Sequence, residues 1–549
     1  MKINKRFTVC GMAIALLFAV VLVLLPGCDK ENVNSPEEQI KEPPPEAALF
    51  DNLTLTTPYK GYNDGNPLFT QNFGADPFAL VYDDRVYIYM TGDTPVPNAS
   101  GEIPQNTYDN INTIRVVSSY DLANWTEYPA IRVAGPQGAA TWANQSWAPA
   151  AAYRNNEGAD QFFLYFANGS ASIGVLKASS PTGPFTDPLK KVLINRSTPN
   201  CNDVTWLFDP AVFIDDDGTG YIYFGGGTPS GGTEGIYPNA NSNHPMPGTI
   251  RAAKLGADMI SLDGNPVKLP APFSFEDNGC FKLGNTYYYT YCTNRGVDGY
   301  ASDAAASEPY HPQAVQIGKG MSIAYMTSDK PLEGFTLRNR ILTNPGEMFN
   351  IKGGNNHHAI FKFKEKHYIT YHSRLLANAM GLDDEGKASA TGEGYRITHV
   401  DEVTITADGT IQEVHGSREG PAQVGRFNPF EMTSAATIAT QAGISTVASG
   451  PRMKVTGINS GDWIALHGVD FGTGAKKFNC RVTVTPSAEK GVIQIKRDGL
   501  DGTAIGYVII EPGKSEITVD LLQTVTGVHD LVFIFYGQGY DFNQWQFLK

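Results

Sequence analysis

Short stretches that alternate between apolar and polar positions, separated by turns, dominate this chain. The clearest covers residues 208–227 and reads FDPAVFIDDDGTGYIYFGGG. An apolar run leads into an acidic turn that contains glycine, and a second, aromatic-rich run leads out of it. Two apolar runs of this length around a tight turn predict a β-hairpin.

The same hairpin pattern occurs five times along the chain. The copies cover residues 75–92, 146–169, 208–227, 275–293 and 356–373. Successive copies begin roughly 60 to 80 residues apart, and a recurring supersecondary unit is typical of a repeat architecture. A propeller blade of four strands usually takes about 40 to 50 residues, so the longer spacing leaves room for insertions. The pattern predicts an all-β fold with a five-bladed β-propeller.

Each copy opens with a polar residue or a tryptophan. These residues are Asp76, Trp147, Asp209, Glu276 and His358. The first strand of each propeller blade lines the central channel, so we expect the five side chains to meet at the channel mouth. An Asp before Pro is more often a turn residue that binds its own backbone. Acidic residues that recur at the start of buried strands are costly, however, and this favours a functional role for Asp76, Asp209 and Glu276.

Three further polar residues and the tryptophan are candidates for binding. Trp147 could stack on the face of a sugar or belong to the core. His357 and His358 follow a GGNN loop, where a histidine can bind substrate, hold a metal ion or pack. Arg396 opens a strand pair at residues 395–412 that we expect to close the last blade onto the first. Its guanidinium could donate two hydrogen bonds to substrate hydroxyls or to a carboxylate.

The pattern changes near residue 430, after a linker at residues 421–429. From there to residue 549 short alternating strands follow one another, with turns every 8 to 12 residues. This spacing over about 120 residues predicts a β-sandwich. The domain prediction is therefore a propeller at residues 51–420 and a sandwich at residues 430–549.

The first 50 residues predict export and anchoring. Residues 1–28 carry a basic start, a long apolar run and the sequence LPGC, which resembles the cleavage site of bacterial lipoproteins. Cys28 would then carry the lipid, although the apolar run is also long enough to span a membrane. Residues 29–50 are charged and rich in proline, and predict a disordered tether. We expect a lipoprotein of the bacterial envelope, held at the outer membrane on its surface or periplasmic face.

Charge and cysteine content exclude some partners. The net charge of −14 argues against nucleic acids and anionic membrane surfaces as partners. Of the 6 cysteines, Cys10 and Cys28 lie in the predicted signal, and the others show no CxxC spacing. We therefore expect no zinc site and no disulfide bond.

Carboxylates on different blades suit glycoside hydrolysis. The reaction needs a carboxylic acid that protonates the leaving oxygen and a carboxylate that activates water or attacks the sugar. An inverting enzyme keeps the two groups about 6.5 to 9.5 Å apart, so that a water molecule fits between them. A third carboxylate nearby would raise the pKa of the acid by repulsion between like charges.

At these residues the chain resembles glycoside hydrolase family 43. The matching stretches are ADPFALVYDDRVYIY, SWAPA, FDPAVFIDDDGTGYIYFGG, FEDNGCFKLGNTYYYTY, GGNNHHAIFKFKEKHYITYH and GYRITHVDEV. The resemblance covers almost all of residues 60–415. The resemblance implies a five-bladed propeller and inverting chemistry, with Asp76 as general base and Glu276 as general acid. It gives Asp209 the role of orienting the acid and tuning its pKa.

The resemblance also implies roles for the other polar residues. His358 matches a histidine beneath the active centre that in many members helps to hold a calcium ion surrounded mainly by water. Arg396 matches an arginine that contacts substrate. The chemistry itself would need no cofactor.

Within the family, two stretches are most similar to the arabinoxylan arabinofuranohydrolases, namely FEDNGCFKLGNTYYYTYCTN and GGNNHHAIF. This implies that arabinoxylan is the substrate and that arabinose side chains are removed. A β-xylosidase of the same fold is an alternative, because the two sugars present similar hydroxyl patterns and loops choose between them. A glycan-binding lipoprotein without activity is a second alternative, which the presence of all three carboxylates disfavours.

The last 120 residues resemble a family 6 carbohydrate-binding module, with three departures. Ala435 and Ala436 stand where members commonly read AE, with the Glu on a structural calcium ion. The ending FNQWQF is shorter than the usual one and lacks its Asp, and a tryptophan usual before the late strands is absent. We therefore expect a weak or lost glycan site and a domain that mainly braces the propeller.

Overall fold

The computed structural model describes residues 40–104, 106–229, 244–303, 310–382, 394–485 and 490–549. The predicted signal and residues 29–39 of the predicted tether lie outside these residues. The sequence predicts disorder for the rest of the tether as well, but Pro45–Phe50 form a short 3-10 helix, because Phe50 packs against the C-terminal domain. Strands dominate the described part of the chain, which confirms the all-β class. The helices are short: η1 (Pro45–Phe50), α1 (Gly296–Ser302), α2 (Tyr310–Ile317), α3 (Pro345–Met348) and α4 (Leu375–Ala379). Within the described ranges, none of them has the length and apolar character to cross a membrane.

Five antiparallel sheets follow one another between residues 75 and 403. The first has β1 (Ala75–Tyr82), β2 (Arg85–Thr91), β3 (Thr113–Ser119) and β4 (Trp125–Glu127), with β5 (Ile131–Arg132) beside β3. The second has β6 (Trp147–Asn156), β7 (Ala159–Asn168), β8 (Ser172–Ala178) and β9 (Ile194–Asn195). The third has β10 (Ala211–Ile214), β11 (Gly220–Phe224), β12 (Arg251–Lys254) and β13 (Val267–Lys268).

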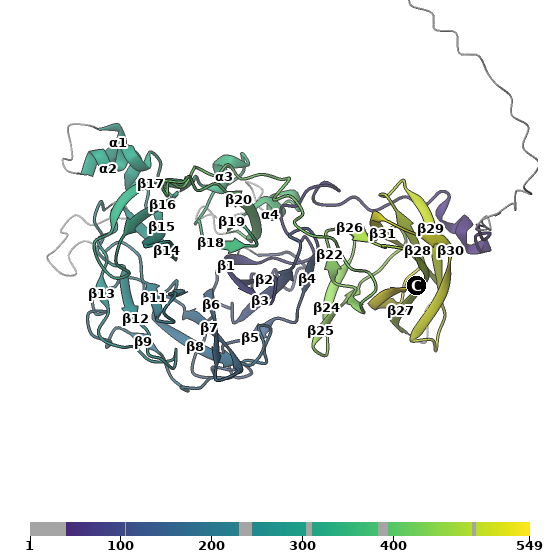
Figure 1. Cartoon of the computed structure of the whole chain (residues 1–549), viewed down its shortest axis with the longest axis horizontal. Coiled ribbons are helices and arrows are strands. Elements are labelled where there is room, and N and C mark those ends of the chain that lie inside the picture. The colour runs from purple at the N-terminus through teal and green to yellow at the C-terminus, as the bar shows by residue number, and fades with distance from the viewer. Residues whose placement is uncertain (1–39, 105, 230–243, 304–309, 383–393, 486–489) are drawn as a thin grey trace, which may run out of the picture. The chain divides into compact units, whose positions relative to one another are not determined.

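The fourth sheet has β14 (Ser274–Leu283), β15 (Thr286–Thr293), β16 (Ile323–Ser328) and β17 (Thr336–Leu342). The fifth has three strands, β18 (His358–Phe363), β19 (Lys366–Ser373) and β20 (Ile397–Val403). The first strands of the five sheets contact one another in a closed cycle, β1 to β6, β10, β14, β18 and back to β1. In Figure 1 the labels of β1, β6, β14 and β18 stand around the middle of this part of the molecule. Each predicted hairpin is thus the inner strand pair of one sheet.

Aromatic second strands are explained by burial on both faces. In β15, which reads TYYYTYCT, every residue after the first is buried. Tyr288 packs into one hydrophobic cluster and its neighbour Tyr289 into another, on opposite faces of the sheet. A strand whose two faces both meet a neighbouring sheet reads as a continuous apolar run, so the aromatic runs mark the inner part of each sheet.

The ring closes differently from the expected strand pair at residues 395–412. Only the first half of that pair is a strand, β20, and residues 405 and 411 form an isolated bridge. Residues 66–74 lie along β20 instead, because Leu68 N donates to Thr398 O and Gly74 N donates to Arg396 O, both at 3.0 Å. The segment that leads into the first sheet therefore completes the last one.

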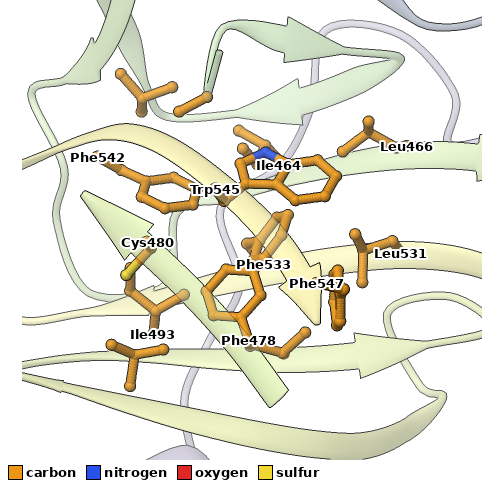
Figure 2. Packing of buried hydrophobic residues seen from close by; sticks show 14 of the residues in the cluster. Ile464, Leu466, Phe478, Cys480, Ile493, Leu531, Phe533, Phe542, Trp545 and Phe547 are labelled. Carbon is orange, nitrogen blue, oxygen red and sulfur yellow. The ribbon is translucent and has the colours of Figure 1, made fainter. Parts of the chain in front are cut away.

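The C-terminal part is a sandwich of two sheets. One has β24 (Ser445–Ser449), β25 (Arg452–Thr456), β32 (Tyr540–Leu548), β27 (Ala475–Val484) and β30 (Glu516–Val525), with β21 (Thr433–Ser434) on β32. The other has β23 (Thr440–Ala442), β26 (Trp463–Asp470), β31 (Val528–Tyr536), β28 (Gly491–Arg497) and β29 (Thr503–Ile510). Phe478, Phe533, Trp545 and Phe547 fill the space between them (Figure 2), with the rings of Phe533 and Trp545 centred 5.3 Å apart.

Residues 40–549 form one compact unit, because the two parts share a sheet. Strand β22 (Thr437–Ile438), which follows β21 of the sandwich, pairs with β4 and extends the first sheet. Glu127 N of β4 donates to Ala436 O at 3.0 Å. The buried Glu127 carboxylate accepts hydrogen bonds from Asn72, at 2.7 Å, and from Thr446, at 2.7 Å.

Candidate active site

An unusual backbone conformation marks the start of four inner strands. Asp76, Ala148, Asp209 and Asp277 have positive φ angles of 47°, 39°, 49° and 63°. Residues other than glycine rarely adopt this region, at a cost of about 1 to 2 kcal/mol each. Strand pairing shifts register at three of the four positions, in β1, β6 and β14. Such bulges re-aim a side chain, here at the meeting point of the inner strands.

This conformation corrects the alignment of the repeats by one residue. Asp277, rather than Glu276, is the equivalent of Asp76 and Asp209. Glu276 precedes the left-handed residue of its strand, as Trp147 precedes Ala148. The pattern of apolar and polar residues cannot show this difference, because the bulge changes the alternation locally.

Asp76 is a buried carboxylate held by Arg396, with two histidines beside it. Arg396 Nη1 donates to Asp76 Oδ1 at 2.7 Å, and the amide of Asp76 donates to His372 Nδ1 at 3.0 Å. Burial opposes ionisation, but the Arg396 guanidinium, together with His372 and His357, holds the pKa of Asp76 below its usual range. Asp76 is therefore ionised at neutral pH, as a general base must be.

The surroundings of Glu276 raise its pKa, whereas those of Asp76 lower the pKa of that residue. The Glu276 side chain is buried, and Oε1 has no hydrogen-bond partner among the described residues. Burial, followed by the charges of Asp209 and Asp76, raises the pKa of Glu276 well above its usual value. A carboxyl group in this situation keeps its proton at neutral pH and can donate it to a leaving oxygen.

The pKa of Asp209 is raised, but opposing influences act on it. Burial raises its pKa to about 7, the His357 imidazole opposes that rise, and the charge of Asp76 adds to it. Asp209 Oδ2 accepts a hydrogen bond from the amide of Asp277 at 2.9 Å. Its charge raises the pKa of Glu276, which is the effect expected of a third carboxylate.

Arg396 uses its whole guanidinium group on carboxylates. Nε and Nη2 donate to the two oxygens of the buried Asp93, each at 3.0 Å, while Nη1 binds Asp76. The guanidinium carbon lies 4.4 Å from the centre of the Tyr108 ring. The amide of Arg396 also donates to Asp93 Oδ2 at 3.0 Å. Of the two partners that the sequence left open for Arg396, the structure shows a carboxylate.

His357 and His358 both face Asp277. His357 Nε2 lies 3.1 Å from Asp277 Oδ1, and its Nδ1 lies 3.7 Å from Asp76 Oδ1 and 3.9 Å from Asp209 Oδ2. Burial lowers the pKa of His357, but the three carboxylates outweigh it and raise the pKa overall. His358 Nδ1 binds Asp277 Oδ2. The structure thus joins Asp76, Asp209 and Asp277 around one imidazole ring.

The expected metal ligand His358 has one free donor atom. Its Nε2 is buried and has no hydrogen-bond partner in the described part of the chain. The same residues contain no group of three or more His, Cys, Asp and Glu side chains able to hold a metal ion. Calcium prefers six to eight oxygen ligands, so this donor set fits only a cation that water mostly surrounds.

A cleft of about 950 Å³ opens beside Glu276. Its aromatic wall consists of Tyr108, Trp206 and Phe275, and asparagines 344, 350 and 355 add amide groups. The Trp206 ring is held edge-on by Phe275, with ring centres 5.0 Å apart. Trp147 Nε1 donates to Tyr108 O at 3.1 Å, so the expected stacking residue supports this wall from the side.

Six residues of the site were not predicted from the sequence: Asp93, Tyr108, Trp206, Phe275, Asp277 and His372. Asp277 had a detectable signal, because it continues the series of Asp residues at left-handed positions once the strands are aligned on them. Trp206 lies three residues before Asp209 and could have been weighed with it. Asp93 and Tyr108 lie in loops outside the repeated pattern and gave no signal.

Glu276, a buried carboxyl group with a raised pKa, borders a cleft with aromatic walls, and the charge of Asp76, a buried carboxylate with a lowered pKa, acts on it. Such a pair of carboxyl groups is typical of a glycoside hydrolase. Comparison with known sequences agrees with this class. Residues 65–411 match the glycosyl hydrolases family 43, and residues 434–549 match the carbohydrate binding module family 6. The chain belongs to glycosyl hydrolases family 43.

Two curated relatives carry the name arabinoxylan arabinofuranohydrolase. The protein from Paenibacillus polymyxa is 41% identical over 505 residues, which are 88% of this chain and 74% of the relative. The protein from Bacillus subtilis is 42% identical over 519 residues, which are 90% of this chain and 94% of the relative. A crystal structure of the Bacillus subtilis family 43 arabinoxylan arabinofuranohydrolase with cellotetraose matches with a TM-score of 0.80 and 40% identity, and covers 90% of this chain and 99% of that one.

Proposed function

We propose that this protein is an inverting, exo-acting α-L-arabinofuranosidase that removes arabinose side chains from arabinoxylan or its oligosaccharides. One observation carries the mechanism: burial and like charges keep Glu276 protonated, while Arg396 keeps Asp76 ionised. The names of the two relatives that match almost the whole described chain support the substrate.

The reaction follows from these protonation states. Glu276 gives its proton to the glycosidic oxygen as the bond from the anomeric carbon to that oxygen breaks. Asp76 takes a proton from a water molecule, whose oxygen forms the new bond to the anomeric carbon from the opposite face. The configuration at that carbon inverts, and Asp209 keeps the pKa of Glu276 high throughout. No cofactor takes part.

Several residues have supporting roles in this proposal. Arg396 holds Asp76 in its ionised form, because all three of its side-chain nitrogens are engaged with Asp76 and Asp93. Tyr108, Trp206 and Phe275 offer faces on which the sugars of the xylan backbone stack. The closed cycle of inner strands supports the interpretation of the five sheets as the five blades of a propeller.

The direct test uses the chain without its first 28 residues on wheat arabinoxylan, with identification of the released monosaccharide. We expect arabinose, in the inverted configuration by proton NMR, and no release by Glu276→Ala. Release of xylose would support the β-xylosidase alternative and leave the roles of the carboxylates unchanged. No release from arabinoxylan, arabinan or xyloglucan fragments, with retained binding, would support the glycan-binding alternative.

The C-terminal domain is proposed to brace the catalytic domain. Phe50, Leu53 and Leu55 of the N-terminal segment pack on the sandwich cluster around Trp463, which is fully buried. Trp463 Nε1 donates to Thr56 O at 3.0 Å, so this sheet face is occupied by the chain itself. Titration of Glu276→Ala with xylohexaose should therefore give one site per chain, and two sites would contradict the proposal.

Anchoring and a cation complete the proposal. Lipid at Cys28 would hold the protein in a bacterial envelope, and Cys28→Ser should abolish incorporation of labelled palmitate. Water-bound calcium at His358 Nε2 would stiffen the channel. A chelator should then lower the melting temperature of the wild type and leave that of His358→Ala unchanged, whereas equal effects on both would contradict a cation at this residue.

A further inference from the structure

Backbone amides of the inner strands are bound by carboxylates of the preceding strand. The amide of Asp277 in the fourth sheet donates to Asp209 Oδ2 at 2.9 Å. The amide of His358 in the fifth sheet donates to Asp277 Oδ2 at 3.2 Å. Asp277 therefore accepts a hydrogen bond from a backbone amide of the fifth sheet, as Asp209 accepts one from the fourth. Both residues have left-handed backbone conformations.

A carboxylate at this position is expensive. Asp277 is fully buried, with 0% of its surface exposed, and its φ angle is 63°. Burying a charged group costs several kcal/mol unless hydrogen bonds and opposite charges compensate it, and the backbone conformation adds to that cost. Strand pairing does not need a carboxylate here, because the neighbouring residues of β14 carry the pairing with β15.

The compensation comes from the two histidines. Asp277 Oδ1 lies 3.1 Å from His357 Nε2, an electrostatic contact that lacks hydrogen-bond geometry, and Oδ2 binds His358 Nδ1. The far side of the His357 ring then points at the reaction centre, with Nδ1 3.7 Å from Asp76 Oδ1 and 3.9 Å from Asp209 Oδ2. The position of this ring between the base and the third carboxylate is thus set from behind, by Asp277.

We propose that Asp277 is a positioning residue of the catalytic centre: it fixes the His357 ring between Asp76 and Asp209 and so fixes where the general base stands. Asp277 does not border the cleft, and in this proposal it acts on the general base through the His357 ring. This inference rests on the proposed hydrolase function. It assigns Asp277 chiefly to the half of the reaction that activates water; its charge also adds to the raised pKa of Glu276, after burial and the charges of Asp209 and Asp76.

Activation of water by the base and protonation of the leaving oxygen by the acid depend differently on the leaving group, and the test uses this difference. We would compare Asp277→Asn with Glu276→Ala on aryl arabinofuranosides whose phenols are weakly or strongly acidic. Loss of the general acid matters little when the phenol leaves easily, whereas a misplaced base slows every substrate. We expect Asp277→Asn to lower kcat by about 10-fold to 100-fold on both substrates, with KM changed less than about 3-fold.

Two further variants separate positioning from stability. Asp401→Asn is the matched control, because Asp401, like Asp277, is a buried aspartate. Its carboxylate accepts hydrogen bonds from the hydroxyl groups of Ser417 and Tyr371, and it lies away from the cleft. This substitution should lower the melting temperature and leave kcat unchanged. His357→Gln should lower kcat as Asp277→Asn does, and the double variant should lose little more, since both changes displace the same ring.

Four results would overturn the inference. These are an unchanged kcat in Asp277→Asn, a loss confined to poor leaving groups, an equal loss in Asp401→Asn, or additive losses in the double variant. If Asp277→Asn fails to fold, His357→Gln alone decides, because it must lose kcat on both substrates. A wild type that is silent on arabinofuranosides but active on aryl xylosides would refute the proposed substrate only, and the comparison is then made on xylosides.

Discussion

Replacement of Arg396 by Met tests the electrostatic basis of the catalytic pair. The change removes three charge-assisted hydrogen bonds, two to Asp93 and one to Asp76, and leaves two buried carboxylates without their cation. Breaking a buried ion pair on one side costs about 3 to 5 kcal/mol. We expect the free energy of unfolding at pH 7 to fall by about that amount, as measured in urea.

The same variant should change the pH dependence of activity. Arg396 is the main charge that holds the pKa of Asp76 down, and an Arg next to an Asp lowers the pKa of the Asp by about 1 to 3. Without it Asp76 takes up a proton at higher pH, so the acidic limb of kcat/KM should move upward by about 1 to 3 pH units. Stability depends on pH in the same direction as activity. An Asp whose pKa is depressed in the folded protein stabilises the fold above the pKa of about 3.9 that it has in the unfolded chain, and it loses that contribution as pH falls.

The control is Arg340→Met, which removes a comparable pair of hydrogen bonds outside the site. Arg340 donates to both oxygens of Glu413, at 2.9 and 3.0 Å, but the pair is partly exposed. Arg340→Met should lower the free energy of unfolding by at most about 1 kcal/mol and leave the pH profile of activity unchanged. An acidic limb that stays in place in Arg396→Met would refute the assignment of Asp76 as a base whose ionisation depends on Arg396.

Three further predictions concern other parts of the protein. Asp209→Asn removes a charge that raises the pKa of Glu276, so the basic limb of kcat should move to lower pH, and an unmoved limb would separate Asp209 from the acid. Trp206→Ala should raise KM for arabinoxylan oligosaccharides about 3-fold to 10-fold with little change on aryl arabinosides, because stacking contributes about 0.5 to 1.5 kcal/mol. Glu127→Ala should lower the free energy of unfolding by about 2 to 4 kcal/mol, since three side-chain donors lose their acceptor, and kcat should not change.

The repeated hairpins predicted the architecture because their signal is local. Two apolar runs around a glycine turn determine a hairpin wherever they occur, and five copies require five sheets. The aromatic second strands, such as β15, indicate burial on both faces. The acidic residues stood out for the same reason, since charges at the start of buried strands have few structural explanations.

The partners of those residues depended on tertiary structure. Asp93 meets Arg396 across 303 residues, and Asp277 meets His357 across 80, with no pattern in the sequence to connect them. The one-residue offset between Glu276 and its expected repeat position arises from a bulge, whose φ angle no alternation of residues reveals. The completion of the fifth sheet by residues 66–74, and of the first by β22, also joins segments far apart in the chain.

The sequence by itself therefore determined which elements form and which side chains could do acid and base chemistry. Only the tertiary structure decided which carboxyl group keeps its proton. Asp76 and Glu276 are both buried acids at the start of inner strands, and their ordinary pKa values are similar. Arg396 lies against Asp76, whereas like charges act on Glu276. This difference in pKa depends on distances of a few ångströms between residues from different sheets.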